Sequence, residues 1–334
     1  MSDAACDAEP RQEPYSPLHK AIFSALNNRL VETLIVAGIA VGALAVTVVD
    51  GLLGTRLAQQ LIAGLRDASR DRLSPLRSAQ IRHVFRCRYG LRKIRLRLAG
   101  GSYWLSIPCI VEGVRDGEEV RYMAKIINET SALKHRYMTM LRNLGVLASA
   151  SDLRFDEHMD AEDMVNFERY CLTQIRGQDL KAPAVIGVHR LNPDDYMLVT
   201  EYIAGQPLSE VSITGDGIDQ VLDIVKTMHE HRLVHGDVKL DNFMFSRGRV
   251  FVLDCLKMGG SALRAAESFD LMCALCALSQ KAPVAMVIAH ARERFSPEEL
   301  RKAAEFLDIA VSKADIDLPQ EKVRELRRAL GGQG

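Results

Sequence analysis

Apolar and polar side chains alternate along the middle of the chain, which is the pattern of half-buried β-strands. The alternation runs through residues 93–111, 119–128 and 196–205. Asp116 and Gly117, which lie between the first two stretches, are typical turn residues. The pattern therefore predicts a β-rich region in which a tight turn joins two of the strands.

Apolar residues at helical spacing dominate the second half of the chain. They appear in residues 161–177, which end at a glycine, and again in 216–232, and the chain is mostly helical after Asp254. Cys273 and Cys276 have C-x-x-C spacing but lie in an apolar run without a second pair, so we expect them to pack in the core. Strands followed by helices, without an internal repeat, predict the α+β class.

The N-terminal region has a different texture. Residues 1–30 begin with a polar stretch typical of a disordered segment, and 31–54 contain an uninterrupted apolar run, 33–49. The run predicts a hydrophobic helix, which we interpret as a membrane anchor, with a buried subdomain helix as the alternative. Arginine is slightly more frequent after the run, so we expect a cytoplasmic-membrane protein that faces the cytoplasm. A soluble cytoplasmic protein is the alternative.

Charge is balanced overall but unevenly distributed. The chain has 43 basic and 43 acidic residues, which argues against an extended coat for nucleic acid. Residues 55–90 predict a basic amphipathic linker helix, and the stretch 77–97 has many arginines and no acidic residue. This basic stretch is a candidate contact for anionic lipid or RNA. A solvated helix followed by a strand is the alternative interpretation.

A cluster of polar side chains interrupts the apolar pattern between Asp237 and Asp254. Asn242 follows Asp237 by five residues, and residues 243–253 predict a hairpin that would bring Asn242 and Asp254 together. Carboxylate and amide oxygens are the ligands that Mg²⁺ prefers, and a further carboxylate can orient a hydroxyl group. These residue types are those that phosphoryl transfer from ATP requires.

The cluster resembles the catalytic loop of the protein-kinase-like superfamily. His235, Asp237, Lys239 and Asn242 match its H-x-D-x-K-x-x-N pattern, and Asp254 matches its metal-binding aspartate. The resemblance implies that Asp237 orients the acceptor hydroxyl and that Lys239 contacts the transferring phosphate. It also implies that Asn242 and Asp254 hold Mg²⁺ (or Mn²⁺), and that His235 braces the loop.

The resemblance implies a bilobal fold. A small β-rich N-lobe would occupy 91–203 with an insert at 128–160, and a mainly helical C-lobe would occupy 204–334. The N-terminal hydrophobic helix would precede both lobes.

Further positions match the superfamily in the expected chain order. Lys125 in "RYMAKII" resembles its phosphate-binding lysine, and Glu168 is the best candidate for the helix glutamate that pairs with it, with Glu162 as the alternate. Glu201 and Ile203 would offer backbone groups to adenine. Downstream, the resemblance implies that Asp270 supports the backbone of the catalytic loop.

Two departures indicate a particular branch. Gly100, Gly101 and Ser102 form an incomplete glycine-rich loop, which would still offer backbone N–H groups to phosphates. Only a short interval separates Asp254 from Asp270, so a long activation segment has no room. Both features, with "WLSIPCIV" and the C-terminal "FSPEELRKAAEFLDIAVSKADIDLP", resemble atypical RIO-type kinases and their archaeal relatives.

The leading functional prediction is an ATP- and Mg²⁺-dependent RIO-like kinase that phosphorylates Ser or Thr on a protein or on itself. One alternative is a small-molecule or envelope lipid or sugar kinase, similar to aminoglycoside phosphotransferases. The other is a RIO-like ATPase or nucleotide-binding scaffold.

Overall fold

A five-stranded antiparallel sheet forms the first half of the fold. The computed structural model describes residues 73–99, 106–129, 153–255, 263–313 and 315–331, and also 131, 132, 135, 136, 139 and 143. The sheet has the order β1-β2-β3-β5-β4 and consists of β1 (Arg92–Leu98), β2 (Ile107–Arg115), β3 (Glu118–Asn128), β4 (Val185–Arg190) and β5 (Asp195–Glu201).

The predicted turn between β2 and β3 is confirmed. Arg115 pairs with Glu118 across a two-residue connection. Asp116 and Gly117 both have positive φ angles, 54° and 91°, as the turn of a right-twisted two-residue hairpin requires. Aspartate and glycine tolerate this region better than most residues, so the turn fixes the register of the two strands.

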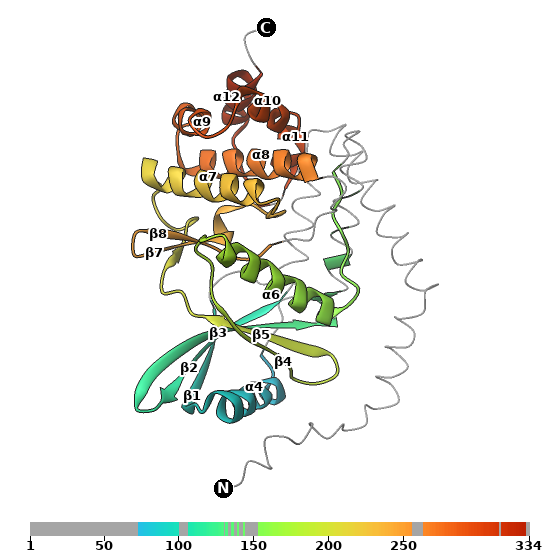
Figure 1. Ribbon diagram of the computed structural model, residues 1–334, viewed down its shortest axis with the longest axis vertical. Coiled ribbons are helices and arrows are strands. Elements are labelled where there is room, and N and C mark those ends of the chain that lie inside the picture. The colour runs from blue at the N-terminus through green and yellow to red at the C-terminus, as the bar shows by residue number, and fades with distance from the viewer. Residues whose placement is uncertain are drawn as a thin grey trace, which may run out of the picture.

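One helix covers each face of this sheet (Figure 1). Met197 and Val199 of β5 point into a core shared with α4 (Pro75–Tyr89), whereas Leu198 points into a core shared with α6 (Ala161–Gly177). Alternate residues of one strand thus serve two cores. α4 is the described part of the helix predicted over 55–90. We expected a linker that precedes the β-rich lobe, but α4 packs directly against the sheet and belongs to it.

Local sequence signals fix the ends of both helices. The Ser74 side chain accepts a hydrogen bond from the Arg77 amide at the start of α4, and Gly90 follows the helix at φ 65°. Asp160 caps α6 in the same way by accepting a hydrogen bond from the Asp163 amide. The prediction of a helix over 161–177 is confirmed.

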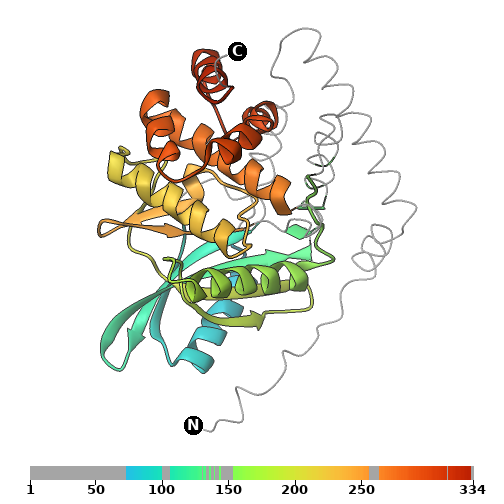
Figure 2. The same cartoon turned by 45° about the horizontal axis from the view of Figure 1, so that its top comes forward.

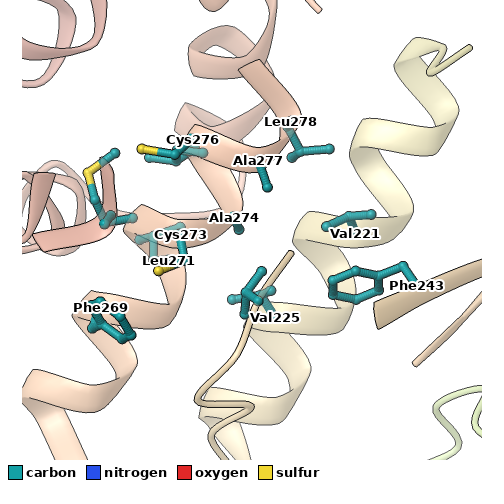
Figure 3. Packing of buried hydrophobic residues seen from close by; sticks show 14 of the residues in the cluster. Val221, Val225, Phe243, Phe269, Leu271, Cys273, Ala274, Cys276, Ala277 and Leu278 are labelled. Atoms are coloured by element: carbon teal, nitrogen blue, oxygen red, sulfur yellow. The ribbon is translucent and has the colours of Figure 1, made fainter. Parts of the chain in front are cut away.

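The second half of the fold is helical, as predicted, and α8 lies at its centre (Figure 2). Its helices are α7 (Gly215–Glu230), α8 (Leu263–Lys281), α9 (Val284–Arg292), α10 (Pro297–Ala304), α11 (Leu307–Ser312) and α12 (Gln320–Leu330). The side chains of α8 from Phe269 to Ser279 are buried on all sides, and Figure 3 shows several of them against Val221 and Val225 of α7. Cys273 and Cys276 are buried free thiols, so their predicted core packing is confirmed.

A small second sheet lies between the two halves. It consists of β6 (Gln206–Pro207), β7 (Phe243–Ser246) and β8 (Arg249–Val252). The predicted hairpin is confirmed, because Phe243 pairs with Val252 and the turn at Arg247 and Gly248 has positive φ angles. This hairpin carries the polar cluster at its open end.

The described residues bear out an α+β protein with a β-rich first part and a helical second part. Among the helices that the structure describes, none has both the length and the apolar character needed to cross a bilayer. The segments 1–30 and 31–54, including the apolar run 33–49, lie outside the described residues.

Candidate active site

The backbone of the candidate catalytic loop, residues 235–242, is held by a buried carboxylate on α8. Asp270 accepts hydrogen bonds from the amides of His235, at 2.5 Å, and Gly236, at 2.9 Å. Gly236 has a φ angle of 75°, which glycine adopts without strain. Burial lowers the pKa of His235, so the ring is neutral and its Nδ1 can accept from the Asp237 amide at 3.3 Å. These contacts fix the position from which Asp237 projects.

Asp237 is surrounded by cationic and amide donors. Its Oδ2 lies 3.1 Å from Lys239 Nζ and 3.2 Å from Asn242 Nδ2, and its backbone carbonyl accepts a second bond from Asn242 Nδ2 at 2.8 Å. Its Oδ1 lies 3.0 Å from Nζ of Lys313. Burial opposes the charge of Lys239, but Asp237 and Asp315 outweigh it and raise the pKa of that ammonium. Each carboxylate oxygen of Asp237 therefore faces a lysine.

A second ionic group joins three elements that are far apart in the sequence. Nζ of Lys125, on β3, lies 2.8 Å from Glu168 Oε2 on α6 and 3.1 Å from Asp254 Oδ1 after β8. Burial raises the pKa of Glu168 to about 7 in spite of the attraction of Lys125. Of the two candidate glutamates, Glu168 makes this ion pair, whereas Glu162 accepts a hydrogen bond from the Tyr196 hydroxyl at 2.8 Å.

The β7–β8 hairpin brings Asn242, which precedes β7, next to Leu253 and Asp254, which follow β8. The Leu253 amide donates to the Asn242 carbonyl at 2.8 Å, and Asp254 then turns the chain with a φ angle of 48°. Aspartate tolerates this left-handed conformation, and its side chain remains 49% exposed. The amide nitrogen of Asn242 is used by Asp237, so its side-chain oxygen is the atom left for a metal. An amide oxygen beside a half-exposed carboxylate fits Mg²⁺.

The linker between the halves is the candidate adenine site. The Glu201 amide donates to the Ala184 carbonyl at 2.8 Å, so this amide is not offered to a nucleotide. The carbonyl of Glu201 and the backbone of Ile203 are the remaining candidates. Gly205, which follows this linker, lies in close contact with the backbone of Phe245 in β7. Gly100, Gly101 and Ser102 lie outside the described residues.

The predicted basic contact surface lies on α4 and β1, two elements that carry none of the site residues described above. Exposed cations on α4 and β1 are Arg82, Arg86, Arg88, Arg92, Lys93, Arg95 and Arg97. Arg77 instead forms a two-bond ion pair with the buried Asp195, at 2.8 Å for each bond, and so fastens α4 to β5. Contact of the stretch 77–97 with anionic lipid or RNA stays a prediction.

Comparisons with known proteins add little to this geometry. No protein-family model and no curated protein matches the chain. Among solved structures, it is similar to a protein of Haemophilus somnus 129PT that is provisionally named a fructosamine-3-kinase. That similarity has a TM-score of 0.38 and 11% identity over 75% of this chain and 95% of the other. A match at this level carries no conclusion about family or function, so the kinase-like interpretation depends on the residues and distances above.

Proposed function

We propose that this chain transfers the γ-phosphoryl group of ATP to a hydroxyl group. The observation that carries the proposal is Lys125, which bridges Glu168 at 2.8 Å and Asp254 at 3.1 Å. A lysine placed in this way is available to nucleotide phosphates, while the carboxylate of Asp254 is available to a metal. The independent cluster around Asp237 supplies the acceptor side of the same reaction.

Each residue has one task in the proposed reaction. Lys125 would bind phosphates of ATP, and Asn242 with Asp254 would hold Mg²⁺ (or Mn²⁺), which neutralises phosphate charge when bound. Asp237 would orient the acceptor hydroxyl and take its proton as the oxygen bonds to the γ-phosphorus and ADP leaves. Lys239 would contact the phosphoryl group in transit.

A small hydroxyl compound suits the acceptor side better than a polypeptide. The Asp237 side chain is only 11% exposed, and Lys313, from the connection after α11, lies against it. The interval between Cys255 and α8 is short, so it offers little chain on which an extended polypeptide could be held. We therefore place small-molecule phosphorylation ahead of a RIO-like Ser/Thr protein kinase. ATP hydrolysis by a scaffold is the third candidate.

Two substitutions test the proposal in the full chain. Asp254→Asn should abolish the thermal stabilisation that ATP gives in the presence of Mg²⁺. Asp237→Asn should keep that stabilisation but reduce phosphoryl transfer by about 100- to 10,000-fold, the usual range for a general acid–base group. Both are measured beside Asp241→Asn, a control on the same loop whose carboxylate accepts a hydrogen bond from Ser209.

The destination of labelled γ-phosphate chooses among the three candidates. Label in a small molecule supports the first, label in protein the second, and label only in free phosphate the third. If ATP with Mg²⁺ does not stabilise the wild-type protein at all, the proposed function is wrong. Membrane association through 33–49 stays a separate prediction, and comparison of the full chain with a form that lacks residues 1–54 by fractionation tests it.

A further inference from the structure

Lys313 is the one described cation of the site that the kinase-like motifs do not account for. It follows α11, 76 residues after Asp237 in the chain, and its Nζ lies 3.0 Å from Asp237 Oδ1. Its side chain is only 13% exposed, so it differs from an ordinary surface lysine. Removing an ammonium from water is costly, and the carboxylate of Asp237 offsets that cost.

Packing of α11 against α8 determines the position of the Lys313 side chain. Its ammonium lies 5.7 Å from the ring centroid of Phe269, a buried residue of α8 next to the loop-holding Asp270. Phe306 and Leu307, at the start of α11, are also buried, and the rings of Phe306 and Phe269 are 6.2 Å apart. Because α11 packs on α8 through these rings, the packing of the helical core places Lys313 beside Asp237.

The two oxygens of Asp237 have different surroundings. Oδ2 is taken by two donors of the catalytic loop, Lys239 and Asn242. Oδ1 instead faces Lys313, a residue from outside that loop, at 3.0 Å. A hydroxyl bound there would have the Lys313 ammonium as its immediate neighbour.

We propose that Lys313 recognises an anionic group on the phosphoryl acceptor. The acceptor would then be a small hydroxyl compound with a carboxylate or phosphate close to the reacting hydroxyl. This inference rests on the proposed function. An anionic group would make a charge-assisted hydrogen bond with Lys313, whereas a cationic group in the same position would lie next to a like charge. Asp315, another nearby carboxylate, lies 3.4 Å from Lys239 and is its second ionic partner.

Small molecules that have been separated by charge can be offered as acceptors to test the inference. A small-molecule cell extract is divided by ion exchange into anionic, neutral and cationic fractions, and each is incubated with the full-length protein and γ-labelled ATP with Mg²⁺. We expect label in the anionic fraction. Phosphatase treatment of that fraction before the reaction removes the acceptor if its anionic group is a phosphate ester and spares it if the group is a carboxylate.

Variants at Lys313 link the preference to this side chain. Lys313→Met should raise the KM for the labelled acceptor by about 10- to 100-fold, the effect of losing one hydrogen bond to a charged group, with a smaller change in kcat. Lys313→Arg keeps the charge and should restore most of the affinity. Lys322→Met is the matched control, because Lys322 is another partly buried lysine of the C-terminal helices and donates to the carbonyls of Ser279 and Ala282.

The outcomes separate this inference from the proposed function. Transfer to the neutral or cationic fraction, or to protein, overturns the anionic acceptor while leaving phosphoryl transfer intact. An equal loss of kcat for Lys313→Met and Lys322→Met, without a change in KM, also overturns it, because a purely structural lysine would behave in this way. Absence of both label transfer and stabilisation by ATP with Mg²⁺ instead contradicts the proposed function itself.

Discussion

Glu168 is the residue at which burial and charge compete most strongly. Lys125 attracts its carboxylate at 2.8 Å, but burial, together with the negative charge of Asp254, raises the pKa of Glu168 to about 7. In the unfolded chain the same carboxyl group titrates near 4.5. The folded protein therefore retains this proton over a pH range in which the unfolded chain has lost it.

This difference predicts a specific pH dependence of stability. The contribution of Glu168 to the free energy of unfolding is present in full below pH 4.5. It is lost as the pH rises through about 7, because the folded state then has to release its extra proton. Over that interval the free energy of unfolding should fall by an amount on the order of 1–3 kcal/mol from this group. Glu168→Gln should remove that part of the slope.

Denaturant unfolding between pH 5 and 8 measures the slope. Glu162→Gln is the matched control on the same helix, because its exposed carboxylate is bonded to Tyr196 and not to Lys125. The interpretation fails if Glu168→Gln and wild type lose stability in parallel across this range. The absolute stability of Glu168→Gln carries less information, since the substitution also weakens the pairing of Lys125.

Single residues were the hardest to place from the sequence. Glu162 and Glu168 lie roughly 120° apart around a helix, and only the packing of α6 on the sheet decides which of them meets Lys125. Lys313 belongs to no motif, because its contact with Asp237 depends on how α11 packs against α8. A chain-order signal could find Lys125 and Asp270, whereas a contact made by tertiary packing leaves no such signal.

Among the elements, the linker between sheet and helices depends on one close backbone approach. A Cβ atom on Gly205 would lie 2.3 Å from the carbonyl oxygen of Phe245 in β7. Backbone atoms cannot move aside as a flexible side chain can, so Gly205→Ala should push the linker away from the small sheet. We expect a loss of roughly 1–3 kcal/mol in the free energy of unfolding.

The same substitution should weaken nucleotide binding, because Glu201 and Ile203 immediately precede Gly205. Thermal shift with ATP and Mg²⁺ measures both effects. Gly177→Ala is the control, since a Cβ atom there meets no atom within 4 Å. Unchanged stability and unchanged nucleotide response in Gly205→Ala would mean that the linker tolerates displacement.

Elements with strong local signals were predictable, whereas their partners were not. The helix over 161–177 and the hairpin between Asn242 and Asp254 follow from capping, periodicity and turn residues, and both are confirmed. For 55–90 the basic pattern predicted a linker helix. The described part of this helix, α4, is instead a layer of the fold. Its Ile81 and Phe85 are buried against the sheet, and its Arg77 forms an ion pair with Asp195 of β5. Helical spacing alone does not reveal what covers an apolar face.

At the scale of the whole molecule, the apolar residues that the structure describes form two cores separated by the five-stranded sheet. One core lies between the sheet and α4, and the other runs from the opposite face of the sheet through α6 to α8 and the C-terminal helices. The candidate site is built on the second core, because Glu168, Asp270 and Lys313 come from α6, α8 and the end of α11. Disturbance of the first core should therefore reach the site only through the sheet.

A matched pair of core substitutions tests this division. Phe85→Ala, in the first core, and Leu275→Ala, in the second, each remove a fully buried side chain and should lower stability by about 2–5 kcal/mol. For Phe85→Ala we expect faster amide hydrogen exchange in α4, β1 and β2 while α8 keeps its protection, because local opening does not require the helical half to unfold. For Leu275→Ala we expect faster exchange in α8 and in the sheet alike. Equal loss of protection in α8 for both variants would show instead that the two cores unfold as one unit, so that α4 supports the candidate site as directly as α8 does.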